Sequence, residues 1–154
     1  MMRKNWMCTA AGVGGWLMLT AGCNTYQVRP LPYDAELKEV VVVDNPKVIV
    51  PDFRMNLEEQ FGAHGFRVRV QSNTMAVKPG ELVIRYDARR SWDFVTYLTD
   101  ASVFAYKDGV LVGRGQYHHV GQSFSLDIFT KWRGTEWKMA ELYERFFSNY
   151  PQQK

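Results

Sequence analysis

The sequence predicts an α+β domain in which two helices cover one face of a mostly antiparallel sheet of 4-5 strands, in the order β-α-β-β-β-α. Three observations carry this prediction. Residues 82–89 alternate between apolar and polar side chains, which is typical of a half-buried strand. An Asp-Gly pair at residues 108–109 separates two apolar runs, as in a tight β-hairpin. Residues 139–147 carry apolar side chains at the spacing of an amphipathic helix.

Residues 39–43, where four valines follow a glutamate, and residues 47–50 are two β-branched runs, and either could form a strand. Pro46 forces a break or a bulge between these two runs. The first helix is expected to start at Asp52, a residue type that caps helices. Its buried face is predicted from side chains that recur every four positions: Phe53, Leu57 and Phe61.

Four further candidate strand segments and a helix follow the first helix. Residues 66–70 alternate strictly, with arginines directed outward. After the strand that begins at Leu82, long apolar runs at residues 94–106 and 110–118 flank the Asp-Gly pair. The last helix is defined by one apolar stripe, which Trp132 extends backwards: Met139, Leu142, Tyr143, Phe146 and Phe147.

Residues 1–22 have the three parts of a bacterial export signal. The basic residues Arg3 and Lys4 lie near the start, an apolar stretch of about 14 residues follows, and small residues end the segment. A membrane-spanning helix needs roughly 20 apolar residues, so this stretch is too short for an ordinary span. The sequence therefore predicts that residues 1–22 are removed.

At the exit of this segment, the residues Leu-Thr-Ala-Gly-Cys at positions 19–23 resemble the bacterial lipobox, with Thr20 in place of the commoner leucine. The resemblance implies cleavage before Cys23, a diacylglycerol on its sulfur and an acyl chain on its new amine. More than one acyl chain gives stable membrane anchoring. Asn24 stands where sorted lipoproteins of the inner membrane carry aspartate, so the resemblance implies the periplasmic face of the outer membrane.

The mature chain has no cysteine other than Cys23, because Cys8 leaves with the signal. We therefore expect no disulfide within one chain and no thiolate metal cluster. Loss of Arg3 and Lys4 leaves 17 basic against 16 acidic side chains, which gives no support to a nucleic-acid partner. Beyond the covalent diacylglycerol and N-acyl chain on Cys23, no cofactor is expected.

The mature chain is divided into a tether and one domain. Residues 24–38 are polar, contain two prolines and show no periodicity, which predicts a tether that begins at the lipidated Cys23. Residues 39–150 are expected to form a single α+β domain in the periplasm. An exposed edge strand of such a sheet would allow pairing with a second copy or with another protein.

Residues with catalytic or metal-binding potential are few. His118 and His119 are adjacent in a strand, so their side chains should point to opposite faces and cannot easily share a metal. His64 suits the end of a helix. The stretch around Ser123 lacks the second glycine of a nucleophile elbow. We predict no catalytic residue and no metal site.

Residues 89–94 combine two cations with aromatic side chains. This mixture predicts an interaction patch made of Arg89, Arg90, Trp92 and Phe94, which would grip a polyanion or the face of a sugar ring. The alternative is that the aromatic side chains fill the core while the arginines lie at its rim.

Residues 82–147 resemble a family of small, uncharacterised proteobacterial outer-membrane lipoproteins. The similarity lies in five residue pairs, none of them a catalytic motif: Trp92-Asp93, Asp108-Gly109, Val112-Gly113, Lys131-Trp132 and Thr135-Glu136. The element order is also similar to the periplasmic domains of lipoproteins that activate peptidoglycan synthases, and of related assembly lipoproteins. This layout implies fold more than function. Those activators have long disordered linkers, whereas residues 24–38 would span about 50 Å fully extended, which disfavours an inner-membrane partner.

Three functions follow from these features, in order of preference. The first is a non-enzymatic interaction or assembly module that is anchored in the outer membrane and binds an envelope protein. The second is a carrier or sensor that holds a lipid or a glycan fragment between sheet and helices. The third is an envelope hydrolase that would use His118, His119 or Ser123.

Overall fold

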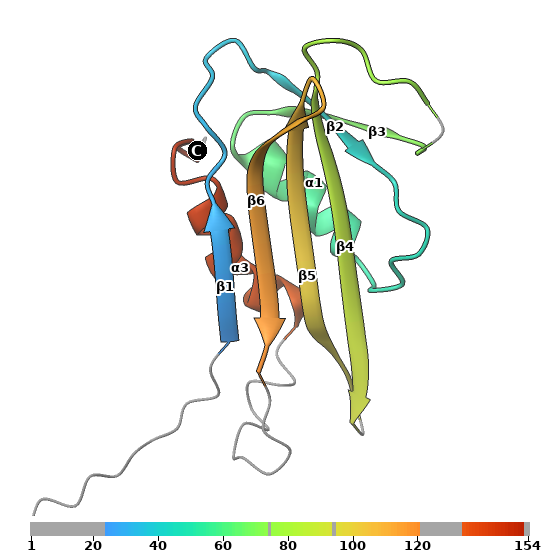
Figure 1. Ribbon diagram of the computed structural model, residues 1–154. Helices are drawn as coiled ribbons and strands as arrows, with labels where there is room; N and C mark the ends of the chain where they lie inside the picture. The colour runs from blue at the N-terminus through green and yellow to red at the C-terminus, as the bar shows by residue number, and fades with distance from the viewer. Residues whose placement is uncertain (1–23, 74, 94, 121–133, 153–154) are drawn as a thin grey trace, which may run out of the picture.

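The computed structural model describes residues 24–73, 75–93, 95–120 and 134–152. These residues form one six-stranded sheet with the strand order β1-β6-β5-β4-β2-β3 (Figure 1). The strands are β1 (Asn24–Arg29), β2 (Glu39–Val43), β3 (Arg67–Gln71), β4 (Leu82–Asp93), β5 (Val95–Lys107) and β6 (Val110–His119). The helices are α1 (Phe53–Ala63) and α3 (Thr135–Phe146).

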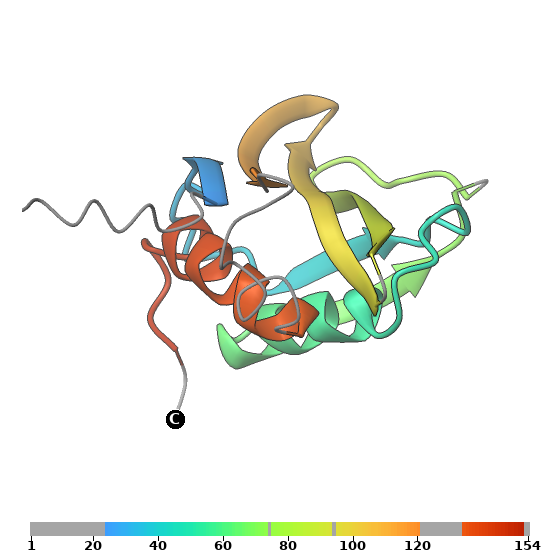
Figure 2. The same cartoon turned by 90° about the horizontal axis from the view of Figure 1, so that it is seen from below.

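Both helices lie on one face of the sheet, as Figure 2 shows from below. The core lies between this inner face and the helices, and it includes the predicted stripes of both. Phe53, Leu57 and Phe61 of α1 are buried. The predicted stripe of α3 is buried as well: Met139, Leu142, Tyr143, Phe146 and, directly after the helix, Phe147. Aromatic rings join the two helices, with the Phe61 and Phe147 centroids 4.8 Å apart. The α+β class and the placement of both helices on one face are therefore confirmed.

The strand count and the sheet type differ from the prediction. The sheet has six strands rather than 4-5, and it is mixed, because β2 pairs in parallel with both β3 and β4. The cause is the β2–α1–β3 connection, in which a crossover helix returns the chain in the same direction and makes the two strands parallel. The remaining pairs, β1 with β6, β6 with β5 and β5 with β4, are antiparallel.

The largest correction concerns the predicted tether. Its first six residues form β1, which pairs along its whole length with β6, from Asn24 opposite His119 to Arg29 opposite Arg114. Leu31 behind this strand is buried, and its N–H donates to the carbonyl oxygen of Phe146 at 2.9 Å. Residues 24–31 therefore belong to the domain, and the prediction of a tether is wrong for them.

Two smaller predictions for the first half are also corrected. Residues 47–50 form turns and bends rather than a strand, although Val50 is buried at the start of α1. Asp52 is the N-cap residue of α1 as expected, but its side chain makes no capping hydrogen bond within the described residues. Its backbone has φ 58°, a left-handed conformation that aspartate tolerates better than most residues.

The hairpin between β5 and β6 confirms the Asp-Gly prediction. Asp108 and Gly109 have φ values of 50° and 79°, the pair of positive values that a tight two-residue turn requires. The next strand comes very close to α3, because an ideal Cβ built on Gly115 would lie 2.7 Å from Cδ2 of Leu142. Glycine in β6 thus lets the last helix lie directly on the sheet.

In the part of the chain that the structure describes, neither helix is long and apolar enough to cross a membrane.

Candidate functional site

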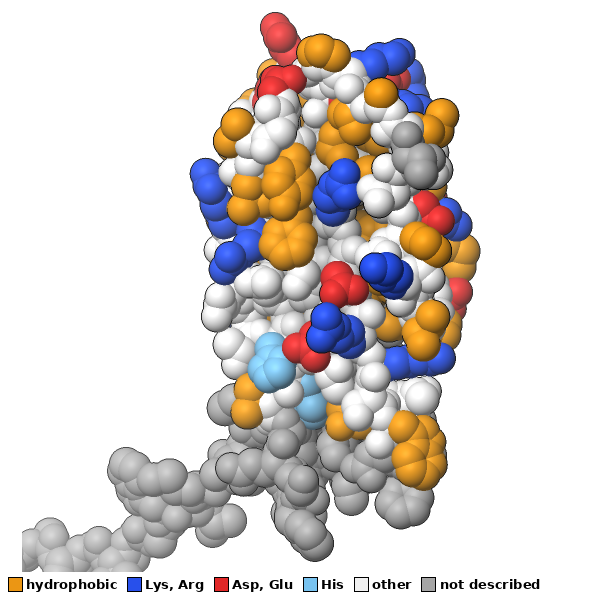
Figure 3. Space-filling model, turned by 45° about the vertical axis from the view of Figure 1, so that its right-hand side comes forward, with side chains coloured by type: hydrophobic (Ala, Val, Ile, Leu, Met, Phe, Trp, Pro, Cys, Tyr) orange, Lys and Arg blue, Asp and Glu red, His pale blue; other side chains and the backbone are white. Residues whose placement is uncertain are grey.

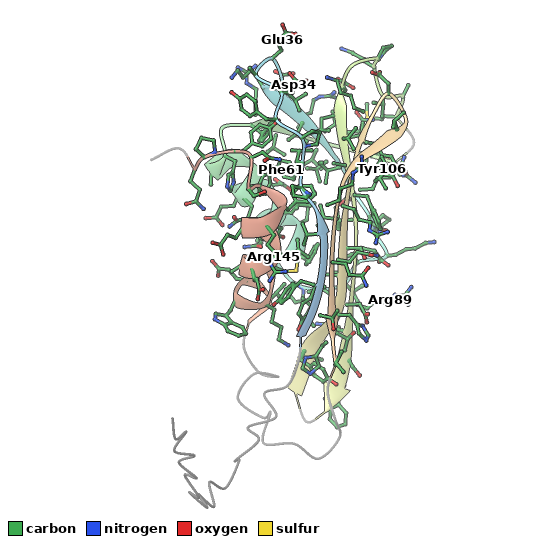
Figure 4. All side chains as sticks on the ribbon, turned by 60° about the vertical axis from the view of Figure 1, so that its left-hand side comes forward. Asp34, Glu36, Phe61, Arg89, Tyr106 and Arg145 are labelled. Atoms are coloured by element: carbon green, nitrogen blue, oxygen red, sulfur yellow. The ribbon has the colours of Figure 1, made fainter. Side chains whose placement is uncertain are left out.

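The described residues of the predicted patch, Arg89, Arg90 and Trp92, do not all lie on one face of the sheet. Arg89 projects from the outer face of the sheet, away from the helices (Figure 4), where it lies 3.7 Å from a carboxylate oxygen of Asp87. Arg90 has the opposite direction and lines a cavity on the helical side. Trp92 is 70% exposed near the end of β4. Phe94 lies outside the described residues, as do Cys23 and Ser123.

A β-bulge alters the end of the β4–β5 pair. Arg89 pairs with Asp100 and Arg90 pairs with Leu98, so Thr99 is an extra residue in β5. The Thr99 hydroxyl donates to the carbonyl oxygen of Arg89 at 3.2 Å. Leu98 is buried and marks the inner face, so its partner Arg90 is directed towards the helices. The bulge lies in β5, where the extra residue Thr99 brings Leu98 to the inner face opposite Arg90.

The cavity behind this bulge has a volume of about 480 Å³. It lies between the end of the β4–β5 pair and the N-terminal ends of both helices. Strands β4 and β5 contribute Arg90, Thr96 and Tyr97, while the region of α1 contributes Asp52, Asn56 and Glu59. Gly134, Thr135 and Glu136 close it from α3. Its described lining mixes apolar side chains, among them Val50, Met55 and Leu98, with polar ones, and it has more acidic than basic side chains.

The cavity receives the N-terminal ends of two helices. Asp52 and Gly134 are the N-cap residues of α1 and α3, and both line it. The first backbone N–H groups of a helix have no partner inside the helix and carry a partial positive charge. Oδ1 of Asn56 is buried beside them and accepts no hydrogen bond from the described residues. Together these groups suit a small polar ligand that both donates and accepts hydrogen bonds.

Lys138 is a buried cation near this cavity that the sequence reasoning missed. Its side chain is fully buried, and Nζ donates to the carbonyl oxygen of Leu98 at 3.3 Å and lies 5.3 Å from the centroid of the Tyr97 ring. These contacts join the first turn of α3 to β5. The sequence does indicate this burial, because Lys138 lies four residues before Leu142 and eight before Phe146, the spacing of the buried face of α3.

The histidines occupy three different environments. His118 is exposed on the outer face, and its Nδ1 lies 2.5 Å from Oδ1 of Asp100. His119 is buried on the inner face, where its ring meets Tyr97 edge-on at 5.5 Å. The prediction that the adjacent pair would point to opposite faces is confirmed. His64 directly follows the last turn of α1. Its ring stacks on Phe147 with the centroids 4.1 Å apart, and its Nδ1 lies 2.8 Å from the carbonyl oxygen of Gln60.

Within the described residues, no group of three or more His, Cys, Asp or Glu side chains could hold a metal ion.

No protein-family model and no curated protein matches the sequence. Among solved structures, the chain is similar to PelC dodecamers from Paraburkholderia phytofirmans. One, a single-substitution variant, is 14% identical with a TM-score of 0.49, covering 80% of this chain and 100% of that chain. Another is 15% identical with a TM-score of 0.48, covering 79% and 98%.

Proposed function

We propose that this chain is a non-enzymatic interaction module, anchored by lipid on Cys23 to the periplasmic face of the outer membrane, where it binds an envelope protein. The observation that carries the proposal is the position of β1. This strand starts at Asn24, one residue after Cys23, and it is paired from its first residue. Lipid on Cys23 would therefore hold one defined end of the sheet against the membrane, because no linker separates Cys23 from β1.

The residues at that end support this orientation. Asn24 pairs with His119 at the end of β6. The end of β4 and the start of β5 lie at this same end of the sheet (Figure 1). Trp92 near that turn is 70% exposed, and Trp137 in the first turn of α3 is 47% exposed. Tryptophan suits the boundary between lipid and water, because its ring is apolar and its N–H is polar. The opposite end and the outer face of the sheet would then be open to the periplasm.

The anchoring part of the proposal is tested in cells that are fed an alkyne-bearing fatty acid. The wild-type protein should incorporate the label and fractionate with the outer membrane, whereas Cys23→Ala should not be labelled. A matched Asn24→Asp variant keeps Cys23 and should move the labelled protein to the inner membrane. Equal labelling of wild type and Cys23→Ala would refute the anchor.

The binding part is tested by photo-crosslinking from single sites, followed by mass spectrometry. A photoreactive residue at Arg114 samples the outer face of the sheet, and one at Glu144 samples the exposed side of α3. We expect one dominant envelope protein from one of these sites. Its capture should be lost when the Cys23→Ala form is exported by an ordinary signal peptide. A lack of any specific adduct from either site would refute the interaction module.

The cavity favours a second candidate function, a carrier or sensor for a small polar ligand such as a glycan fragment. Native mass spectrometry of protein purified from cells would reveal a copurified mass. Thr96→Trp narrows the cavity and should remove that mass, while Arg145→Gln on the exposed side of α3 should retain it. A spectrum of the bare chain in all three cases would exclude the carrier.

A further inference from the structure

The outer face of the sheet carries a row of side chains that crosses four strands. Arg85 of β4 is opposite Phe104 of β5, Phe104 is opposite Arg114 of β6, and Arg114 is opposite Arg29 of β1. Directly opposed residues share a face of the sheet, so these four side chains form one line perpendicular to the strands. We call this line the arginine row. In Figure 3, basic side chains (blue) lie among hydrophobic ones (orange) on this side of the molecule.

The arginine row concentrates positive charge. Neighbouring strands are about 4.8 Å apart, so Arg29 and Arg114 are next to each other and Arg85 lies two strands further on. Like charges directly opposite one another destabilise a sheet. The opposed pair of Arg29 and Arg114 therefore carries an unfavourable electrostatic term that a bound anion would offset.

The acidic side chains of the same face do not neutralise the row. Asp87 already lies 3.7 Å from Arg89, and Asp100 lies 2.5 Å from His118. Within the described residues, no carboxylate lies within ion-pair distance of Arg29, Arg85 or Arg114. The positive charge of the row is thus uncompensated by its own surroundings.

Neutral acceptors hold the three guanidinium groups in place. Arg85 donates to Oδ1 of Asn73 at 2.9 Å, Arg29 donates to the carbonyl oxygen of Leu111 at 3.3 Å, and Arg114 donates to Oε1 of Gln27 at 3.3 Å. Each bond orients a planar group and uses a small part of its N–H donors. Oriented guanidinium groups bind carboxylates through two parallel hydrogen bonds.

We propose that the arginine row binds an acidic polysaccharide that crosses the strands, with its carboxylates on Arg29, Arg85 and Arg114 and a sugar ring against half-buried Phe104. The next row along the strands offers groups for sugar hydroxyls: Ser102, Gln116 and Gln27. On β4 this row continues to Asp87, a carboxylate that lies 3.7 Å from Arg89. A peptide is disfavoured, because the central strands β4, β5 and β6 are paired on both edges and cannot accept an added strand. This surface is separate from the cavity, so the proposal goes beyond the function proposed above.

The test measures binding of oligogalacturonate, a chain of carboxylate-bearing sugars, to the full mature chain by isothermal titration calorimetry. Arg114→Gln and Arg85→Gln should each weaken binding about 10-fold or more, as expected for the loss of one charge-assisted pair. Arg145→Gln removes the same charge from α3 on the other side of the molecule and should leave affinity unchanged. Neutral dextran should not bind, and the affinity should fall with added salt.

Three outcomes would overturn the proposal. One is an absence of oligogalacturonate binding by the wild type while its urea midpoint shows a folded chain. Another is an equal loss of affinity in Arg145→Gln and Arg114→Gln, which would indicate bulk charge. The third is row-dependent binding to phosphatidylglycerol vesicles or to a DNA oligonucleotide with the same affinity, which would indicate a general anion surface. Phe104→Leu separates the two parts of the site, because it should weaken the glycan without changing the salt dependence.

Discussion

Replacement of Gly115 by alanine tests the closest contact between the sheet and the last helix. An added Cβ would lie 2.7 Å from Cδ2 and 3.2 Å from Cγ of Leu142. Carbon atoms pack at about 3.5–4.0 Å, so either the strand or the leucine must move. Leu142 is fully buried and cannot swing into solvent. The substitution therefore overpacks the core.

The magnitude follows from two opposing terms. Overpacking costs about 1–3 kcal/mol, while replacing glycine with alanine in a strand returns about 0.5–1 kcal/mol of backbone entropy. Gly115→Ala should therefore lower the free energy of unfolding by about 0.5–2 kcal/mol. Leu142→Ala alone should lower it by about 2–5 kcal/mol, because it leaves a cavity. In the double variant the new methyl group enters that cavity, so its destabilisation should be smaller than the sum by about 1 kcal/mol or more.

Urea unfolding of the mature chain and its three variants measures this cycle. Gly113→Ala is the matched control, because its Cβ would lie 3.3 Å from the Phe146 ring and 3.4 Å from Leu31, and its cost should be smaller than that of Gly115→Ala. Additivity of the two single changes within about 0.5 kcal/mol would refute a direct contact between residues 115 and 142. A Gly115→Ala protein more stable than wild type would do the same.

Other expected outcomes use the same unfolding assay. Phe146→Ala should cost about 3–5 kcal/mol because the ring is fully buried between sheet and helix, and a loss under about 0.5 kcal/mol would contradict that burial. Lys107 donates a hydrogen bond to the carboxylate of Asp34, and this bond lowers the pKa of Asp34 below its usual value. The Asp34→Asn variant should therefore be less stable than wild type near neutral pH. That difference should close as pH falls through the lowered pKa, and a difference that persists in acid would refute the linkage. Gly109→Ala, at φ 79°, should lower the free energy of unfolding by about 1–2 kcal/mol, whereas Gly62→Ala in α1 should raise it by about 0.5–1 kcal/mol. If both variants changed stability in the same direction, the left-handed turn at Gly109 or the helical conformation of Gly62 would be wrong.

The candidate binding surfaces were only partly predictable. The sequence favoured residues 89–94 because cations and aromatics are adjacent there, but the alternation of β4 directs Arg89 and Arg90 to opposite sides of the sheet. The arginine row has no local signature, since Arg29, Arg85 and Arg114 are separated by up to 85 positions. Only strand register brings them into one line.

The elements that the sequence alone predicts correctly are those specified by short-range chemistry. The turn at Asp108 and Gly109 follows from backbone preferences at two positions, and the buried faces of α1 and α3 follow from helical periodicity. The pairing of β1 with β6 and the parallel placement of β2 depend instead on contacts between residues far apart in the chain. A short polar strand such as β1 has little periodicity of its own. Its pairing is decided by the open edge of β6 and by Leu31 entering the core, which only the tertiary structure supplies.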